Sequence, residues 1–267
     1  MFLSRVSRKK NNSTAGTAVI FSTLGVATLV ASILFNLQVA AFIGLGLTFW
    51  GAIFAFTRAG NYVESSLLDS TAKSAYSTIE RMINELKYNG RGYYIPAYPK
   101  DIFLPDYLKN LKDPVVYISE NFDDKPSIDE LAAGKFLSSK TQGILLTAPS
   151  SGIMAQIERQ LQMDLSKISL QELSELLPKC LTEIFNLAKT AELTLTHEGA
   201  NFTASGILYE SFYRSEVSLK SVNMLGCPVV SAVASSLAKT SGKTVIIKQQ
   251  TLSPGNCGVN VVLEFVG

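Results

Sequence analysis

Few side chains in this sequence are of the types that carry out nucleophilic or metal chemistry. His197 is the only histidine, and it lies at the end of a predicted strand beside Glu198. The three cysteines, Cys180, Cys227 and Cys257, are 47 and 30 residues apart, which matches no zinc-site spacing. We therefore predict no metal, no cofactor and no catalytic residue, and we expect His197 to face solvent.

Cys227 is the cysteine whose position could make it reactive. Pro228 follows it, in the favoured first position of a helix predicted to reach about Thr240. The positive end of a helix dipole stabilises a thiolate, which can make a cysteine nucleophilic. The alternative, which we favour, is a buried cysteine that only packs at the start of the helix.

A second candidate site follows a predicted buried strand, Gly143–Thr147. The strand runs into Pro149-Ser150-Ser151-Gly152 and then into a predicted helix over 153–162. Backbone N–H groups at a helix start can bind an anion, so Ser150, Ser151, Gly152 and Cys227 are our candidate ligand or anion-binding residues. No lysine follows as in a P-loop, and helix capping by Ser150 or Ser151 explains the same residues.

The charge distribution separates a basic tip from a nearly neutral body. Four of the 24 Lys and Arg residues precede residue 58, whereas all 22 Asp and Glu residues follow it. The body has no basic cluster of the kind that neutralises nucleic-acid phosphates. We therefore exclude nucleic acid as a partner.

Two uncharged apolar runs near the N-terminus predict a transmembrane helical hairpin. They cover 15–35 and 39–56, and Asn36-Leu37-Gln38 separates them. Each run is long enough to cross a hydrocarbon core of about 30 Å. A cleaved signal peptide is the competing interpretation, but the first run is too long for one and a second run follows it at once.

Basic residues predict the orientation of this hairpin in the membrane. Arg5, Arg8, Lys9 and Lys10 precede the first run and Arg58 follows the second. Because cytoplasmic flanks are rich in Lys and Arg, we expect a multi-pass protein of the cell membrane with both termini in the cytoplasm. Neither run contains an ionisable residue, which argues against a transporter.

The rest of the chain predicts an α+β domain with an antiparallel sheet and packed helices. An amphipathic helix over 62–87 carries one apolar stripe. It either packs on its own domain or pairs with a second copy. Residues 89–139 are proline-rich and predict irregular structure, apart from a strand at 114–118. Their aromatic side chains either fill a core or line a pocket.

Beyond residue 139, helices alternate with hairpins. Ser169 and Glu172 form a capping box, and Pro178 predicts a kink or two abutting helices. Hairpins are predicted over 192–209 and 244–266. The predicted organisation is a basic tip (1–14), the hairpin (15–57), a juxtamembrane helix (58–89) and a cytosolic α+β domain (90–267).

Three stretches resemble a known group of proteins. GILLTAPSSGIMAQIERQL at 143–161, Leu176-Leu177-Pro178 and LGCPVVSAVASSLAKTSGK at 225–243 are similar to archaeal membrane proteins that join two N-terminal spans to a cytosolic domain. That resemblance implies no activity. Members often carry a second cysteine three residues after the first, where this chain has Val230, which argues against a metal or redox role for Cys227. The C-terminal part faintly resembles 4-vinyl-reductase-like small-molecule-binding domains.

These observations favour a non-enzymatic, membrane-anchored module that binds a small molecule or a protein partner. The alternative is a structural or assembly protein, a homo-oligomer formed through the 62–87 helix and the hairpin. An enzyme that uses Cys227 or the Ser150/Ser151 site is the third hypothesis.

Overall fold

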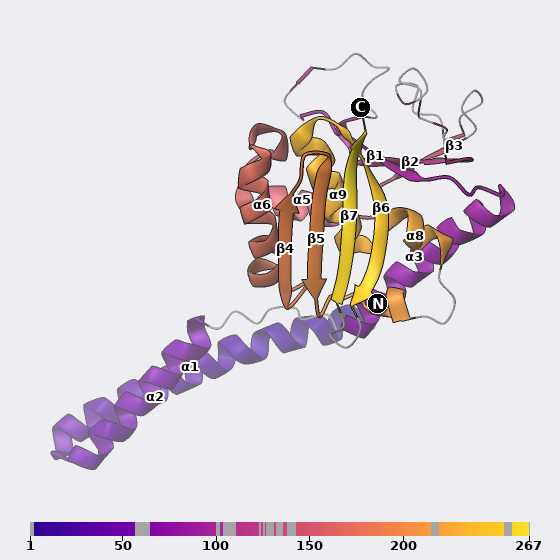
Figure 1. The fold of residues 1–267 in the computed structure, drawn as a ribbon. Helices are drawn as coiled ribbons and strands as arrows, with labels where there is room; N and C mark the ends of the chain where they lie inside the picture. Colours follow the sequence, from indigo (N-terminus) through magenta and orange to yellow (C-terminus); the bar gives the residue numbers. More distant parts are fainter. Residues whose placement is uncertain are drawn as a thin grey trace. The chain divides into compact units, whose positions relative to one another are not determined.

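The computed structural model consists of two compact units, Met1–Val63 and Glu64–Gly267. Figure 1 shows the helices and strands of each unit. The residues that the structure describes are 3–56, 65–99, 102–103, 111–122, 124, 126, 131, 136–137, 143–214, 219–253 and 258–266.

The first unit is a helical hairpin. Helix α1 (Leu3–Phe35) and helix α2 (Gln38–Phe56) meet at Asn36, whose backbone adopts the left-handed conformation with φ of 55°. A Cβ atom on Gly25 would lie 2.6 Å from the backbone nitrogen of Thr48. Glycine at this position therefore allows the backbones of the two helices to approach closely. The predicted turn at residues 36–38 is confirmed.

Both helices contain segments long and apolar enough to cross a membrane. These are Gly16–Phe35, with 20 residues, and Gln38–Ala55, with 18. A third segment, Lys220–Ser241, meets the same criteria, but 89% of it is buried inside the second unit. Its apolar composition is therefore explained by the protein core. The first two segments present apolar side chains outward.

The second unit is α+β, as predicted. Its helices are α3 (Ser65–Glu85), α5 (Ser151–Leu161), η2 (Leu165–Lys167), α6 (Leu170–Lys179), η3 (Cys180–Ile184), α7 (Ser211–Arg214), α8 (Lys220–Leu225) and α9 (Pro228–Ser241). Its strands are β1 (Gly92–Ile95), β2 (Val115–Ser119), β3 (Gly143–Thr147), β4 (Thr190–Leu195), β5 (Gly199–Ser205), β6 (Thr244–Ser253) and β7 (Gly258–Val266).

The strands of the described residues form one antiparallel sheet in the order β3-β2-β1-β6-β7-β5-β4. Alternate residues face opposite sides, as the two-residue period of a strand requires. Tyr94, Val116 and Val245 belong to the main core between the sheet and the helices. Tyr93, Tyr117 and Ile246 belong to a smaller core on the other face.

Helix α9 is the centre of the main core and contacts β1, β6 and β7 (Figure 1). Twelve of its residues, Pro228 to Lys239, are buried. Pro228 takes the first helical position, and Gly242 ends the helix in a left-handed conformation with φ of 67°. The predicted boundaries of this helix are confirmed.

Helix α3 packs on its own unit. Tyr76 and Ile83 are buried in the main core, and Ala72 and Ile79 pack against it. The first of the two interpretations of the apolar stripe is therefore the one that the structure shows.

Three local predictions were wrong. Residues 92–95, expected to be irregular, form β1 in the middle of the sheet. The turn of the first hairpin lies at residues 196–198, not 198–201, because β5 already begins at Gly199. Neither Ser150 nor Ser151 caps α5 through its side chain: Ser150 occupies the N-cap, but its hydroxyl makes no capping hydrogen bond.

Two other local predictions are confirmed. Ser169 and Glu172 form the capping box of α6. Pro178 lies one residue before that helix ends, where the backbone changes to the π-helical turn η3. Of the two expectations for Pro178, the structure shows two abutting helical segments, α6 and η3.

Candidate functional site

A pocket of about 380 Å³ lies between β1, β6 and α8, and we call it the basic pocket. Its cationic side chains are Arg91, Lys220 and Lys248. The other residues that line it are Asn89, Gly90, Gly92, Phe122, Asn223, Met224 and Ile247. None of these described lining residues is acidic, so the wall of the pocket carries three formal positive charges.

The pocket lies next to the paired part of β1 and β6, since Gly92 of β1 and Ile247 of β6 line it. Their pairing includes Tyr93 with Ile246 and Tyr94 with Val245. On β6 the register shifts between Ile247 and Gln249, which places Lys248 at a β-bulge. A bulge bends the strand and redirects a side chain, and here the bulged residue is a lysine that lines the pocket.

Gly92 allows α8 to form the opposite wall. A Cβ atom on Gly92 would lie 2.6 Å from the carbonyl oxygen of Met224. A larger residue would therefore push the end of α8 away from β1. The close approach brings Lys220 and Asn223 of α8 to the same pocket as Arg91.

The partners of the three cations are an aromatic ring, an amide and one carboxylate that does not line the pocket. The Arg91 guanidinium lies 5.4 Å from the centre of the Phe122 ring. The Lys220 ammonium donates to the Asn89 side-chain oxygen at 3.0 Å. Lys248 pairs with Glu264 at 2.8 Å, and Glu264 does not line the pocket. An amide and an aromatic ring orient Lys220 and Arg91 without neutralising them.

Helix α8 is too short to be stable by itself, and Glu80 of α3 supports its start. The Ser221 backbone N–H donates to the Glu80 carboxylate at 2.7 Å. Burial raises the pKa of Glu80, but this hydrogen bond and others outweigh it, so the pKa is lowered overall. Glu80 is therefore a charged cap for the helix that carries Lys220 and Asn223.

A second pocket, of about 250 Å³, lies on the other side of Asn223. We call it the Tyr213 pocket, and it is lined by Phe212, Tyr213, Val222, Asn223, Gln250, Thr251 and Leu252. The Tyr213 hydroxyl donates to the Gln250 side-chain oxygen at 3.2 Å and accepts from the Cys227 backbone N–H at 3.0 Å. The Gln250 amide donates to the carbonyls of Val222 and Asn223, each at 3.0 Å.

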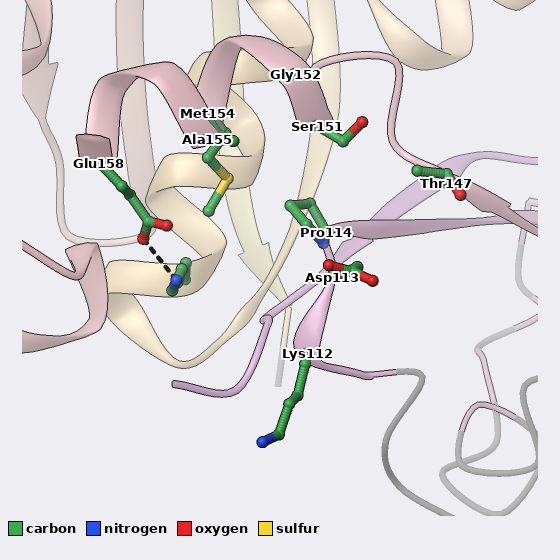
Figure 2. A pocket seen from close by; sticks show the side chains of 10 residues that line it. Lys112, Asp113, Pro114, Thr147, Ser151, Gly152, Met154, Ala155 and Glu158 are labelled. Carbon is green, nitrogen blue, oxygen red and sulfur yellow. Dashed lines mark hydrogen bonds and ion pairs between the residues drawn. The ribbon is translucent and has the colours of Figure 1, made fainter. Parts of the chain in front are cut away.

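Ser151 and Gly152 line a third pocket, of about 360 Å³, which we call the Ser151 pocket. Lys112, Asp113, Pro114, Thr147, Met154, Ala155, Glu158 and Lys239 complete its lining (Figure 2). Its two lysines are matched by two carboxylates. The described wall therefore carries no net charge, unlike that of the basic pocket.

Ser150 is separated from that pocket. It is fully buried, and its hydroxyl lies 2.9 Å from the hydroxyl of Ser235 on α9. Its oxygen thus joins α5 to the core helix. Anion binding by Ser151 and Gly152 stays a prediction.

Lys239 at the end of α9 forms a buried ion cluster that sequence reasoning missed. Its ammonium lies 2.5 Å from a Glu158 oxygen and 3.0 Å from an Asp164 oxygen, and its side chain is only 2% exposed. The Glu158 contact is the dashed line in Figure 2. Burial raises the pKa of Asp164, but hydrogen bonds from Ser166 and the charge of Lys239 lower it to about 2.

Cys227 lies at the start of α9, as predicted, and is completely buried. Burial raises the pKa of its thiol. Tyrosine hydroxyls hold the two preceding residues: Tyr94 donates to the Leu225 carbonyl at 2.5 Å and Tyr76 to the Gly226 carbonyl at 2.7 Å. The surroundings of the thiol therefore favour its neutral form over a nucleophilic thiolate.

The candidate residues predicted from sequence do not form one site. Cys227 precedes α9, whereas the hydroxyl of Ser150 contacts Ser235, eight residues farther on. At about 1.5 Å per residue this separates the two positions by about 12 Å. His197 is exposed at the turn between β4 and β5, as expected. Cys180 is buried, and Cys257 lies outside the described residues.

A comparison with protein families covers nearly the whole chain. A family model described as a domain of unknown function, DUF7982, matches residues 3–264. The chain belongs to this family. No curated protein and no solved structure matches it. DUF7982 brings no assigned activity, and the resemblances to archaeal membrane proteins and to 4-vinyl-reductase-like domains stay predictions.

Proposed function

We propose that this DUF7982 protein is a membrane-anchored, non-enzymatic binding module. In this proposal α1 and α2 cross the cell membrane, and the second unit binds a small anionic molecule in the basic pocket. The basic residues that flank the two apolar segments support a cytoplasmic location for both termini. A hydrophobic anchor and a folded binding unit in one chain would keep the ligand site close to the membrane.

The observation that carries the proposal is the charge of the basic pocket. Three cations from three separate segments, Arg91, Lys220 and Lys248, line one cavity whose described wall has no carboxylate, although Lys248 also pairs with Glu264 outside that wall. Charge-assisted hydrogen bonds from such groups are about twice as strong as neutral ones. The volume of about 380 Å³ lies within the usual range for small-molecule sites.

Thermal unfolding of the full chain in phosphatidylcholine nanodiscs tests the proposal, with inorganic phosphate as the probe. At ten times its dissociation constant, phosphate stabilises the protein by about 1.4 kcal/mol. For a unit of about 200 residues this raises Tm by about 3–6 °C. Sodium chloride of equal ionic strength is the reference.

The decisive comparison uses two arginine variants. Arg91→Ala removes a guanidinium from the pocket, and we expect it to abolish most of the phosphate-dependent rise in Tm. Arg159→Ala removes an exposed arginine from α5, away from the basic pocket, and keeps the rise. Phosphate also stabilises proteins by exclusion from their surfaces. An equal rise in Arg91→Ala and the unchanged protein would therefore refute binding in this pocket.

Self-association is the second candidate function, and one observation favours it. Leu67 and Leu68, next to each other near the start of α3, are 57% and 36% exposed, while Ile79 of the same helix packs on its own unit. Native mass spectrometry of the full chain released from nanodiscs distinguishes the two functions. A dimer that Leu67→Gln converts to monomer supports assembly, and a monomer in both proteins contradicts it.

A further inference from the structure

We propose that the ligand of the basic pocket is an anionic amphiphile. Its anionic group lies among Arg91, Lys220 and Lys248, and its apolar arm enters the Tyr213 pocket. This inference rests on the proposed function and adds the chemical class of the ligand.

The two pockets are neighbours along the same elements. Asn223 of α8 lines both of them. On β6, Ile247 and Lys248 line the basic pocket, and Gln250 to Leu252 line the Tyr213 pocket. At about 3.3 Å per residue these two stretches are centred roughly 12 Å apart. In this proposal a single extended molecule of about that length spans both pockets beside Asn223, the residue that they share.

The polar groups of the Tyr213 pocket are already hydrogen-bonded. The Tyr213 hydroxyl has both a donor and an acceptor partner. Both hydrogens of the Gln250 amide nitrogen are donated to backbone carbonyls, which is the full donor capacity of that group. The hydroxyl of Thr251 donates to the Asn260 carbonyl at 3.4 Å. A ligand group that accepts hydrogen bonds, such as a second anionic group, would have to displace one of these bonds to reach a donor of Tyr213, Gln250 or Thr251, whereas an apolar group leaves them intact.

Beside these polar groups, three side chains, Phe212, Val222 and Leu252, give the Tyr213 pocket an apolar part. Phe212 and Val222 are buried in the main core, and Leu252 is 47% exposed at the end of β6. The Phe212 ring packs edge-on against Tyr76, with 4.9 Å between the ring centres, and this fixes its position. An alkyl or aromatic arm would cover Leu252 and rest against Phe212 and Val222.

Two alkyl phosphates of different length test this inference. Methyl phosphate carries the anion alone, and octyl phosphate adds an apolar arm. We would measure their binding to the full chain in phosphatidylcholine nanodiscs by 31P nuclear magnetic resonance, with empty nanodiscs to correct for partitioning into lipid. Each fully buried methylene strengthens binding about fourfold, so a partly buried octyl arm gives at least tenfold tighter binding than methyl phosphate.

Variants at an exposed leucine and at a matched control separate the arm from the anion site. Leu252→Asn removes the gain from the octyl arm without adding a charge and leaves the affinity for methyl phosphate unchanged, which also shows that the unit is folded. Ile184→Asn is the control, because Ile184 is 42% exposed on η3 and lines neither pocket. It changes neither affinity.

The outcomes distinguish this inference from the proposed function. If neither phosphate binds in a manner that depends on Arg91, the proposed function fails and the amphiphile with it. If methyl phosphate binds through Arg91 but octyl phosphate binds no more tightly, the anion site stands and the amphiphile is refuted. Addition of phosphatidic acid to the nanodiscs identifies the source of the ligand. If phosphatidic acid competes with octyl phosphate for the protein, the ligand is a membrane lipid. If octyl phosphate binds equally tightly in the presence of phosphatidic acid, the ligand is a soluble amphiphile.

Discussion

Substitution of Lys239 by methionine tests the buried ion cluster most directly. The methionine keeps the apolar stem but removes the charge between Glu158 and Asp164, whose side chains are 13% and 17% exposed. Loss of one partner from a buried ion pair costs about 3–5 kcal/mol. Since both carboxylates retain some access to water, we expect about 3 kcal/mol. For a unit of about 200 residues, Tm then falls by about 6–12 °C.

The cost of this substitution depends on pH in a defined direction. The folded pKa of Asp164 is about 2, below its ordinary value of 3.8. Its stabilising contribution is therefore complete above about pH 4 and is lost as the pH falls towards 2. Without the hydrogen bond and charge of Lys239, the Asp164 carboxyl of the native state has a higher pKa and is protonated at higher pH. The difference in stability between the two proteins should therefore be largest at neutral pH and shrink on acidification.

Near-ultraviolet circular dichroism of the buried tyrosines follows this unfolding in the full chain. The only tryptophan, Trp50, lies on α2 in the first unit, whereas nine of the ten tyrosines belong to the second unit. The tyrosine signal therefore reports mainly on the second unit. Lys179→Met, at an exposed lysine at the end of α6, is the matched control and should leave Tm within about 1–2 °C. A Lys239→Met protein as stable as the control at neutral pH would refute the reasoning.

Three further predictions concern the core and one helix cap. Tyr94→Phe removes a fully buried hydroxyl from the Leu225 carbonyl, and we expect a loss of about 1–3 kcal/mol in denaturant unfolding. The Cys227 thiol, buried and with a raised pKa, should resist maleimide in the native protein and react after unfolding; rapid native labelling, read by mass spectrometry, would contradict its burial. Ser169→Ala breaks the capping box with Glu172 and should cost about 1 kcal/mol, whereas Ser169→Asp retains most of the stability.

Strong periodic patterns predicted much of the fold, while the strand that completes the sheet was missed. The α2 segment and the helix after Pro228 each show a long pattern with clear end signals, and both agree with the structure within one or two residues. Strand β1 has four residues, lies between Gly90 and Pro96 and carries two adjacent tyrosines. Its strand conformation depends on pairing with β2 and β6. Those partners come much later in the chain, so local propensity gives no indication of them.

The candidate sites were harder to predict because their residues come together only through tertiary structure. Arg91, Lys220 and Lys248 are spread over most of the second unit and form no charged run. One local sign was available: Gly90 and Gly92 flank Arg91, and paired glycines indicate close backbone approach. For the ion cluster, the sign was Lys239, a lysine in a helix that otherwise consists mostly of small and apolar residues. A lysine that is almost fully buried requires a partner, but sequence alone does not identify Glu158 and Asp164.

The position of α8 connects these observations. This helix has six residues, too few to be stable alone, so contacts from other elements must fix its position. Glu80 holds its start through Ser221, and Gln250 holds its last turn through two carbonyls. The basic pocket and the Tyr213 pocket lie on either side of Asn223, in the middle of the helix. A ligand that fills both pockets adds contacts to a short helix whose position depends on side chains from other elements. Binding should therefore protect the α8 amides from hydrogen exchange more than those of α9, which is already buried along almost its whole length.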